Sequence, residues 1–183
     1  MLTYIPKKSK EIYDVVIAHR GFHKKYPENT IKAFIDAVNK NMSIETDIRM
    51  TKDGYLICLH DRYTKRLLGK TKKCSNMTLD EIRKYNIKNS AEKVPLLEEC
   101  LKIIDNKVPI LLEIKGYLNK EFKRKLIYII YNYNGKVYFH VKNIFTYIIL
   151  RRIWKDKVFY ILNPFRKRFN FIKSRYYKKL TKL

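Results

Sequence analysis

The chain has 183 residues, which corresponds to one domain or to one domain with an appendage. It carries 41 Lys and Arg residues against 17 Asp and Glu residues, which gives a formal net charge of +24. The 46% of hydrophobic residues exclude a disordered chain, and the mere 5 Gly and 5 Pro exclude a collagen or a flexible linker.

The excess positive charge is concentrated in the last third of the sequence. Residues 122–183 contain 17 basic residues and a single acidic one, Asp156, so they carry +16 of the +24. Such a surface can attract nucleic acid, anionic lipid or a phosphorylated substrate. Lys, Ile, Tyr and Asn are abundant and have codons rich in A and T, so drift in an AT-rich genome explains the charge equally well.

The N-terminal residues and the cysteines favour a cytosolic protein. Charged residues stand where a signal peptide needs an apolar core, and no stretch reaches the roughly 18 apolar residues of a membrane span. Cys58, Cys74 and Cys100 are odd in number and lack C-x-x-C spacing, so we expect reduced thiols. We therefore expect a cytoplasmic protein, with peripheral contact to the inner membrane surface as an open alternative.

Short apolar strands alternate with helical patterns along the chain. In chain order, the predicted elements are a strand over 15–18, a helix over 29–40 capped by Asn29 or Thr30, a strand over 43–48, a turn over 51–54, a strand over 55–59, a polar loop over 61–77, a helix opened by a capping box at 78–81, a helix over 96–104, a strand over 109–114, a helix over 121–131, a strand over 136–141, a helix over 144–154 and a strand over 157–162. Strands separated by helices favour parallel pairing, so the sequence predicts an α/β fold.

Polar side chains interrupt strands that should be apolar throughout if they are parallel and buried. They occur at or near the ends of four predicted strands, as His19 and Arg20, Glu45 and Asp47, His60 and Asp61, and Glu113 and Lys115. One such pair alone is typical of a solvated edge strand or a turn. Four pairs in succession are much harder to reach by chance, and α/β folds place their active sites at strand ends.

Strand geometry predicts a metal site from these residues. The two-residue period places Glu45 and Asp47 on one face of their strand, and Glu113 on the same face as Lys115. If these faces share a centre, three carboxylates meet there, and buried carboxylates need compensation. A hard divalent cation, Mg²⁺ or Ca²⁺, supplies it and fits oxygen ligands better than zinc does.

The remaining polar residues fit a phosphate group and proton transfer. Arg20 and Lys115 add positive charge for a phosphate. His19 and His60 suggest a general acid and a general base, in either order. Asp61 can orient His60 or cap a turn. Two further histidines, His23 and His140, are interpreted as incidental to catalysis. Of these, His23 is placed near the rim of the pocket.

Eight short motifs over about residues 15–116 occur in an order and at a spacing that are typical of a known protein family. The motifs are His19-Arg20-Gly21, Pro27-Glu28-Asn29-Thr30, Ala33-Phe34, Glu45-Thr46-Asp47, Thr51-Lys52-Asp53-Gly54, His60-Asp61, Pro95-Leu96-Leu97-Glu98 and Glu113-Ile114-Lys115. In this order and spacing the sequence resembles the glycerophosphodiester phosphodiesterase family.

The resemblance implies a TIM-type barrel that binds one divalent cation at its strand ends. The residues equivalent to the family's functional groups are Glu45, Asp47 and Glu113 for the metal, His19 and His60 for acid–base catalysis, and Arg20 and Lys115 for the phosphate. The implied reaction is the hydrolysis of a small glycerophosphodiester to glycerol 3-phosphate and an alcohol, within lipid and glycerol metabolism. The alcohol is left open.

The sequence also departs from the family. An eight-stranded barrel typically needs about 250 residues, whereas six strands are predicted here and the last ends at residue 162. We therefore expect an incomplete barrel of about six of the eight strands over 1–163, followed by a basic aromatic tail over 164–183. The family's Ser-Phe pair is replaced by His140-Val141-Lys142-Asn143, and Trp154 lies in a helical pattern.

An incomplete barrel leaves two strand edges to be covered. A helix formed by the tail can cover the opening, a homodimer can complete the barrel, or the chain is a truncated remnant. The alternative function is thus a weakly active or non-catalytic barrel that contacts an anionic membrane surface through its tail. Aromatic residues among cations also suit single-stranded nucleic acid, but the sequence contains no nucleic-acid-binding motif.

Overall fold

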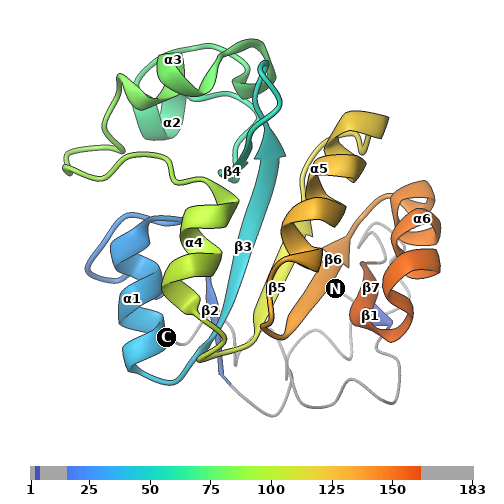
Figure 1. The fold of residues 1–183 in the computed structure, drawn as a ribbon. Coiled ribbons are helices and arrows are strands. Elements are labelled where there is room, and N and C mark those ends of the chain that lie inside the picture. Colours follow the sequence, from blue (N-terminus) through green and yellow to red (C-terminus); the bar gives the residue numbers. More distant parts are fainter. Residues whose placement is uncertain (1–2, 5–15, 162–183) are drawn as a thin grey trace, which may run out of the picture.

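The computed structural model describes residues 3–4 and 16–161 (Figure 1). The strands are β1 (Thr3–Tyr4), β2 (Ile17–His19), β3 (Ser43–Met50), β4 (Leu56–Cys58), β5 (Ile110–Ile114), β6 (Val137–Val141) and β7 (Val158–Ile161). The helices are α1 (Ile31–Asn39), α2 (Lys65–Leu68), α3 (Leu79–Arg83), α4 (Leu97–Ile104), α5 (Lys120–Tyr131) and α6 (Ile144–Trp154), with 3₁₀ turns η2 (Cys74–Asn76) and η3 (Lys155–Lys157).

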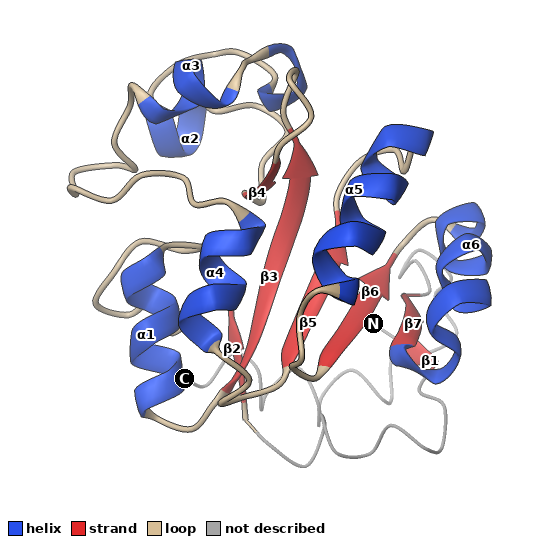
Figure 2. Cartoon of the chain, viewed as in Figure 1, coloured by secondary structure: helices blue, strands red, loops and turns tan. Residues whose placement is uncertain are grey.

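The strands form one sheet in the order β1-β7-β6-β5-β3-β2, with β4 paired to β3. β2, β3, β5, β6 and β7 run parallel to one another. Helices α1, α4, α5 and α6 lie along one side of this curved sheet (Figure 2). Parallel strands with connecting helices on the outer face make part of a (β/α) barrel, so the predicted α/β fold and incomplete barrel are confirmed.

All six predicted strands are present, and the third one follows the predicted turn over 51–54 as the hairpin partner of the second. β4 pairs antiparallel with β3, and Met50 lies opposite Leu56. The tight turn between them is closed by the Thr51 amide, which donates to the Tyr55 carbonyl at 2.9 Å. A parallel connection needs a crossover of a dozen or more residues, so this short turn permits only a hairpin.

The two faces of the sheet bury different side chains. The outer face packs Ile44, Ile48, Leu112 and Phe139 against the helices in the main hydrophobic core. A small separate cluster forms a floor on the inner face and consists of Ile17, Leu111, Tyr138 and Phe159. By the two-residue period of strands, the residues that follow on this inner face toward the carboxyl ends are His19, Glu45, Asp47, Glu113 and His140.

The predicted polar loop over 61–77 contains two short helical segments, α2 and η2. With α3 they cover a second hydrophobic cluster that includes Leu67, Leu68, Met77 and Ile82. The capping box at Thr78 and Glu81 is present, with both reciprocal hydrogen bonds. This small unit lies beyond the carboxyl end of β3 (Figure 1), so it stands beside the end of the barrel where sites form.

One edge of the partial barrel is covered by the N-terminal strand. β1 pairs antiparallel with β7, with Thr3 opposite Ile161 and Tyr4 opposite Tyr160. The tail over 164–183, one of the candidates to cover the opening, lies outside the described residues. No helix in residues 16–161 is long and apolar enough to cross a bilayer. The three cysteines are free and buried.

Candidate metal and phosphodiester site

Three carboxylates meet on the inner face of the sheet. Glu45 and Asp47 come from β3 and Glu113 from β5, and an oxygen atom of each lies within 4.8 Å of the other two. All three are buried, with Asp47 fully so. The parallel register explains the meeting, because Asp47 lies directly opposite Glu113 on the neighbouring strand. The structure thus brings together the three residues that the sequence proposes as metal ligands.

The electrostatics of this cluster favour a bound cation. Burial, together with the charges of Asp47 and Glu113, raises the pKa of Glu45 well above its ordinary range. Among the described residues, the buried Asp47 Oδ1 is compensated by the Lys115 ammonium, which lies 3.0 Å away. Three clustered oxygen donors with incomplete compensation are the ligand set that Mg²⁺ or Ca²⁺ requires, so the residues fit such an ion.

Two lysines compensate part of the negative charge. Lys115 Nζ lies 2.8 Å from Glu113 Oε1 and bridges this carboxylate to Asp47. Lys142, just beyond β6, places its Nζ 2.6 Å from the same Glu113 oxygen. Burial alone would raise the pKa of Glu113, but the two ammonium groups outweigh it and hold that pKa at about 2. Lys115 therefore lies at the carboxylates, where it was predicted, and Lys142 joins it.

A tight turn after β2 positions Arg20. Arg20 and Gly21 both adopt left-handed backbone angles, with φ of 57° and 76°. The Arg20 amide donates to Glu45 Oε2 at 3.0 Å, and its Nε lies 3.3 Å from Asp47 Oδ2. Gly21 is required here because a Cβ would lie 2.9 Å from the backbone of α1. The turn thus brings the Arg20 guanidinium against the carboxylates.

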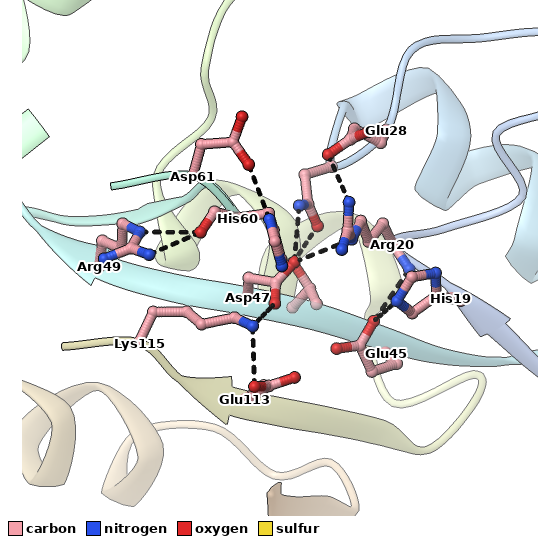
Figure 3. Close-up of polar contacts among 12 residues, drawn as sticks. His19, Arg20, Glu28, Glu45, Asp47, Arg49, His60, Asp61, Glu113 and Lys115 are labelled. Carbon is pink, nitrogen blue, oxygen red and sulfur yellow. Dashed lines mark hydrogen bonds and ion pairs between the residues drawn. The ribbon is translucent and has the colours of Figure 1, made fainter. Parts of the chain in front are cut away.

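The two predicted histidines flank the cluster (Figure 3). His19 Nε2 lies 3.9 Å from Glu45 Oε2, and the His19 side chain is 49% exposed. Burial, followed by the charge of Arg20, lowers the pKa of His19 and favours its neutral form. The ring of His23 lies 6.3 Å from that of His19, which agrees with a place near the rim.

The β3–β4 hairpin returns His60 to the level of the carboxylates. The Leu59 amide donates to the Asp47 carbonyl at 2.9 Å. Arg49 donates twice to the His60 carbonyl, at 2.6 and 3.0 Å, and so holds this backbone in place. Asp61 Oδ1 lies 2.7 Å from His60 Nδ1, as expected for an orienting carboxylate.

A network of ion pairs joins Arg20 to His60. Glu28 accepts from Arg20 at 2.9 Å and from Arg66 at 2.6 and 2.7 Å. Arg66 also donates to Asp61, at 2.6 Å to Oδ2, and Asp61 in turn contacts His60. Burial opposes ionisation of Glu28, but Arg66 and Arg20 prevail and lower its pKa to about 2. The network fixes two sides of the site relative to each other.

Sequence reasoning missed several residues of this region. Asn29 donates to Asp47 Oδ2 at 3.2 Å and accepts from Thr46 at 2.7 Å, while Thr30 alone caps α1. His140 lies opposite Glu113 on β6 with a buried Nε2 that forms no hydrogen bond among the described residues. Burial lowers the pKa of His140 to about 4, although Glu113 opposes the shift. His140 was interpreted from the sequence as incidental to catalysis, and the alternation along β6 was the available signal for its place on the inner face.

The sequence of residues 19–160 matches the family model described as the glycerophosphoryl diester phosphodiesterase family. The match includes all seven predicted site residues and spans well over half of the chain. The chain belongs to this family.

Individual relatives agree with this membership. The chain is 37% identical over 130 residues to a glycerophosphodiester phosphodiesterase of Caldanaerobacter subterraneus, covering 66% of this chain and 54% of the relative. It is 32% identical over 114 residues to human glycerophosphodiester phosphodiesterase 1, covering 57% and 34% of the two chains. The chain therefore spans about half of the first relative and a third of the second.

Solved structures support the same fold. A glycerophosphodiester phosphodiesterase from Thermotoga maritima superposes with a TM-score of 0.66 at 27% identity, over 82% of this chain and 63% of that one. An Oleispira antarctica phosphodiesterase in complex with sn-glycerol-3-phosphate superposes with a TM-score of 0.71 at 22% identity, over 79% and 63%. The described residues are thus part of a TIM barrel.

Proposed function

We propose that this chain hydrolyses glycerophosphodiesters to glycerol 3-phosphate and an alcohol in a reaction that depends on a divalent cation. The observation that carries the proposal is the convergence of three buried carboxylates, Glu45, Asp47 and Glu113, with oxygen atoms within 4.8 Å of one another. Membership of the family and the product named in the Oleispira antarctica complex support the substrate class.

The carboxylates would hold one Mg²⁺ or Ca²⁺ ion. Such a cation supplies Lewis-acid chemistry, because it neutralises a phosphodiester and stabilises the charge of the transition state. Arg20 and Lys115 hold the phosphate from the protein side. Both cations lie against the carboxylates in the described structure, so they stand beside the position proposed for the metal ion.

His19 and His60 act as the acid–base pair in this proposal. One accepts a proton from the nucleophile, which is water or the neighbouring glycerol hydroxyl, and the other donates a proton to the leaving alkoxide. Asp61 holds His60 through Nδ1 and thereby fixes the ring nitrogen that exchanges the proton. The network through Glu28 and Arg66 keeps this histidine in register with Arg20.

The test is the release of glycerol 3-phosphate from purified protein supplied with glycerophosphocholine or glycerophosphoethanolamine. His19→Ala and His60→Ala should each lower the rate by about a hundredfold or more. His23→Ala is the matched control and should keep most of the activity. Equal activity of all three variants and the unaltered chain would contradict the assigned roles.

The wider predictions accompany this proposal. We infer a cytoplasmic location, and the peripheral membrane contact and the homodimer stay predictions. The basic residues of 164–183 on which membrane contact depends lie outside the described residues.

A further inference from the structure

An open hollow of about 650 Å³ adjoins the proposed site on the side of His60. It is lined by His60, Asp61 and Tyr63 together with four cations, Arg49, Arg62, Lys65 and Arg66. The cations come from β3 and from the start of the small unit between β4 and α4. One carboxylate against four cations makes the lining strongly positive.

Two of these cations are already engaged. Arg49 donates to the His60 carbonyl (Figure 3). Arg66 is held by Glu28 and Asp61. The only carboxylate in the lining, Asp61, is itself occupied by Arg66 and His60. Arg66 therefore offsets most of this charge, and little of it is left to compensate the remaining cations.

The other two cations are available to a ligand. Arg62 and Lys65 are exposed, and neither forms an ion pair within residues 16–161. Tyr63 lies between them in the sequence, is 48% exposed and offers an apolar surface. Exposed cations beside an aromatic ring, in a hollow that reaches a proposed catalytic histidine, are suited to bind an anionic organic group.

We propose that this hollow binds the alcohol part of the substrate and selects an alcohol that carries a negative charge. The inference rests on the proposed function, because His60 belongs both to the hollow and to the acid–base pair. In this inference His60 donates its proton to the leaving alkoxide as the bond between phosphorus and that oxygen breaks, so the alcohol attached through this oxygen extends into the hollow. Arg62 and Lys65 then face the carboxylate of a group such as serine.

The test compares glycerophosphoserine with glycerophosphoethanolamine, which differ by one carboxylate. Each contact with an exposed cation is worth about a twofold to fivefold change, so the pair should give about a tenfold preference in kcat/KM for the serine compound at low salt. High salt should reduce this preference because the cations are exposed. The double variant Arg62→Gln/Lys65→Gln should abolish it.

The matched control removes one Arg and one Lys elsewhere. Lys102 on α4 and Arg124 on α5 are exposed and lie outside the lining of the hollow. The variant Lys102→Gln/Arg124→Gln should keep the preference. Turnover without any preference, or a preference unchanged in Arg62→Gln/Lys65→Gln, overturns the inference and leaves the proposed function standing.

Calorimetric binding of the two compounds separates the remaining outcomes. If the chain hydrolyses neither compound but binds glycerophosphoserine more tightly, and the double variant loses this difference, the hollow is supported and the proposed function fails. If the chain neither hydrolyses nor binds either compound, both are overturned.

Discussion

Replacement of Glu28 by Gln would test the ion-pair network that links Arg20 to His60. The substitution keeps the size of the side chain and removes the charge that holds Arg20 and Arg66. Glu28 is 8% exposed, so few water molecules can replace the lost interactions. We expect the variant to be less stable at neutral pH, because two guanidinium groups lose their shared carboxylate.

The magnitude follows from the pKa of about 2 for Glu28. Compared with an ordinary Glu pKa of about 4.3, this corresponds to roughly 3 kcal/mol at about 1.4 kcal/mol per pH unit. Arg66 is 43% exposed, so solvent screening reduces the expected loss to about 1–2 kcal/mol. For a chain of this length the melting temperature should fall by about 2–8 °C.

The assay is thermal unfolding as a function of pH. A depressed carboxyl pKa contributes stability above the unfolded-state pKa and loses it as the pH falls through the folded-state pKa. The difference between the two proteins should therefore be full at pH 7 and shrink between about pH 5 and 2. Asp36→Asn, which removes an exposed pair with Lys40 on α1, is the control and should cost less than about 0.5 kcal/mol. Equal melting temperatures at pH 7, or a difference that persists at the acid limit, would refute the reasoning.

Three further predictions concern backbone, cap and charge. Gly21→Ala should lower the free energy of unfolding in urea by about 2 kcal/mol or more, because the residue has a positive φ and faces the α1 backbone. Gly69→Ala also has a positive φ but has open space around it, so it should lower this free energy by about 1 kcal/mol. Equal losses in the two variants would contradict a close contact between Gly21 and α1. Thr78→Ala should cost about 1 kcal/mol through the lost cap, and no change would show that the capping box does not stabilise α3. Lys142→Gln should tighten Mg²⁺ binding about threefold to tenfold in calorimetry, because the substitution removes an ammonium group that competes with the metal ion for Glu113. Weaker binding in this variant would contradict a role of Glu113 as a metal ligand.

The parts of the site that follow from strand period could be predicted from the sequence. Glu45 and Asp47 lie two residues apart on β3, and their face is fixed once the strand is placed. His60 and Asp61 are neighbours, so their contact needs no tertiary information. The apolar spacing of α1 and the capping box of α3 likewise gave both helices to within a few residues.

The parts that depend on long side chains and on distant contacts could not be predicted. Arg66 reaches Glu28 across 38 residues of sequence from a helix of only four residues, which has no apolar period of its own. Lys142 follows β6, and its side chain contacts Glu113 on β5, the neighbouring strand in the sheet. The antiparallel direction of β4, by contrast, does follow from the sequence, because the Asp-Gly turn over 51–54 is typical of a hairpin.

The most direct test of the central claim is metal-dependent turnover by the purified chain. Glycerol 3-phosphate released from glycerophosphoethanolamine is measured after treatment with a chelator and again after Mg²⁺ or Ca²⁺ is restored. The expected result is no release after chelation and recovery with one of the two ions, through Glu45, Asp47 and Glu113. Turnover that is unaffected by the chelator, or absent with either ion, would contradict it.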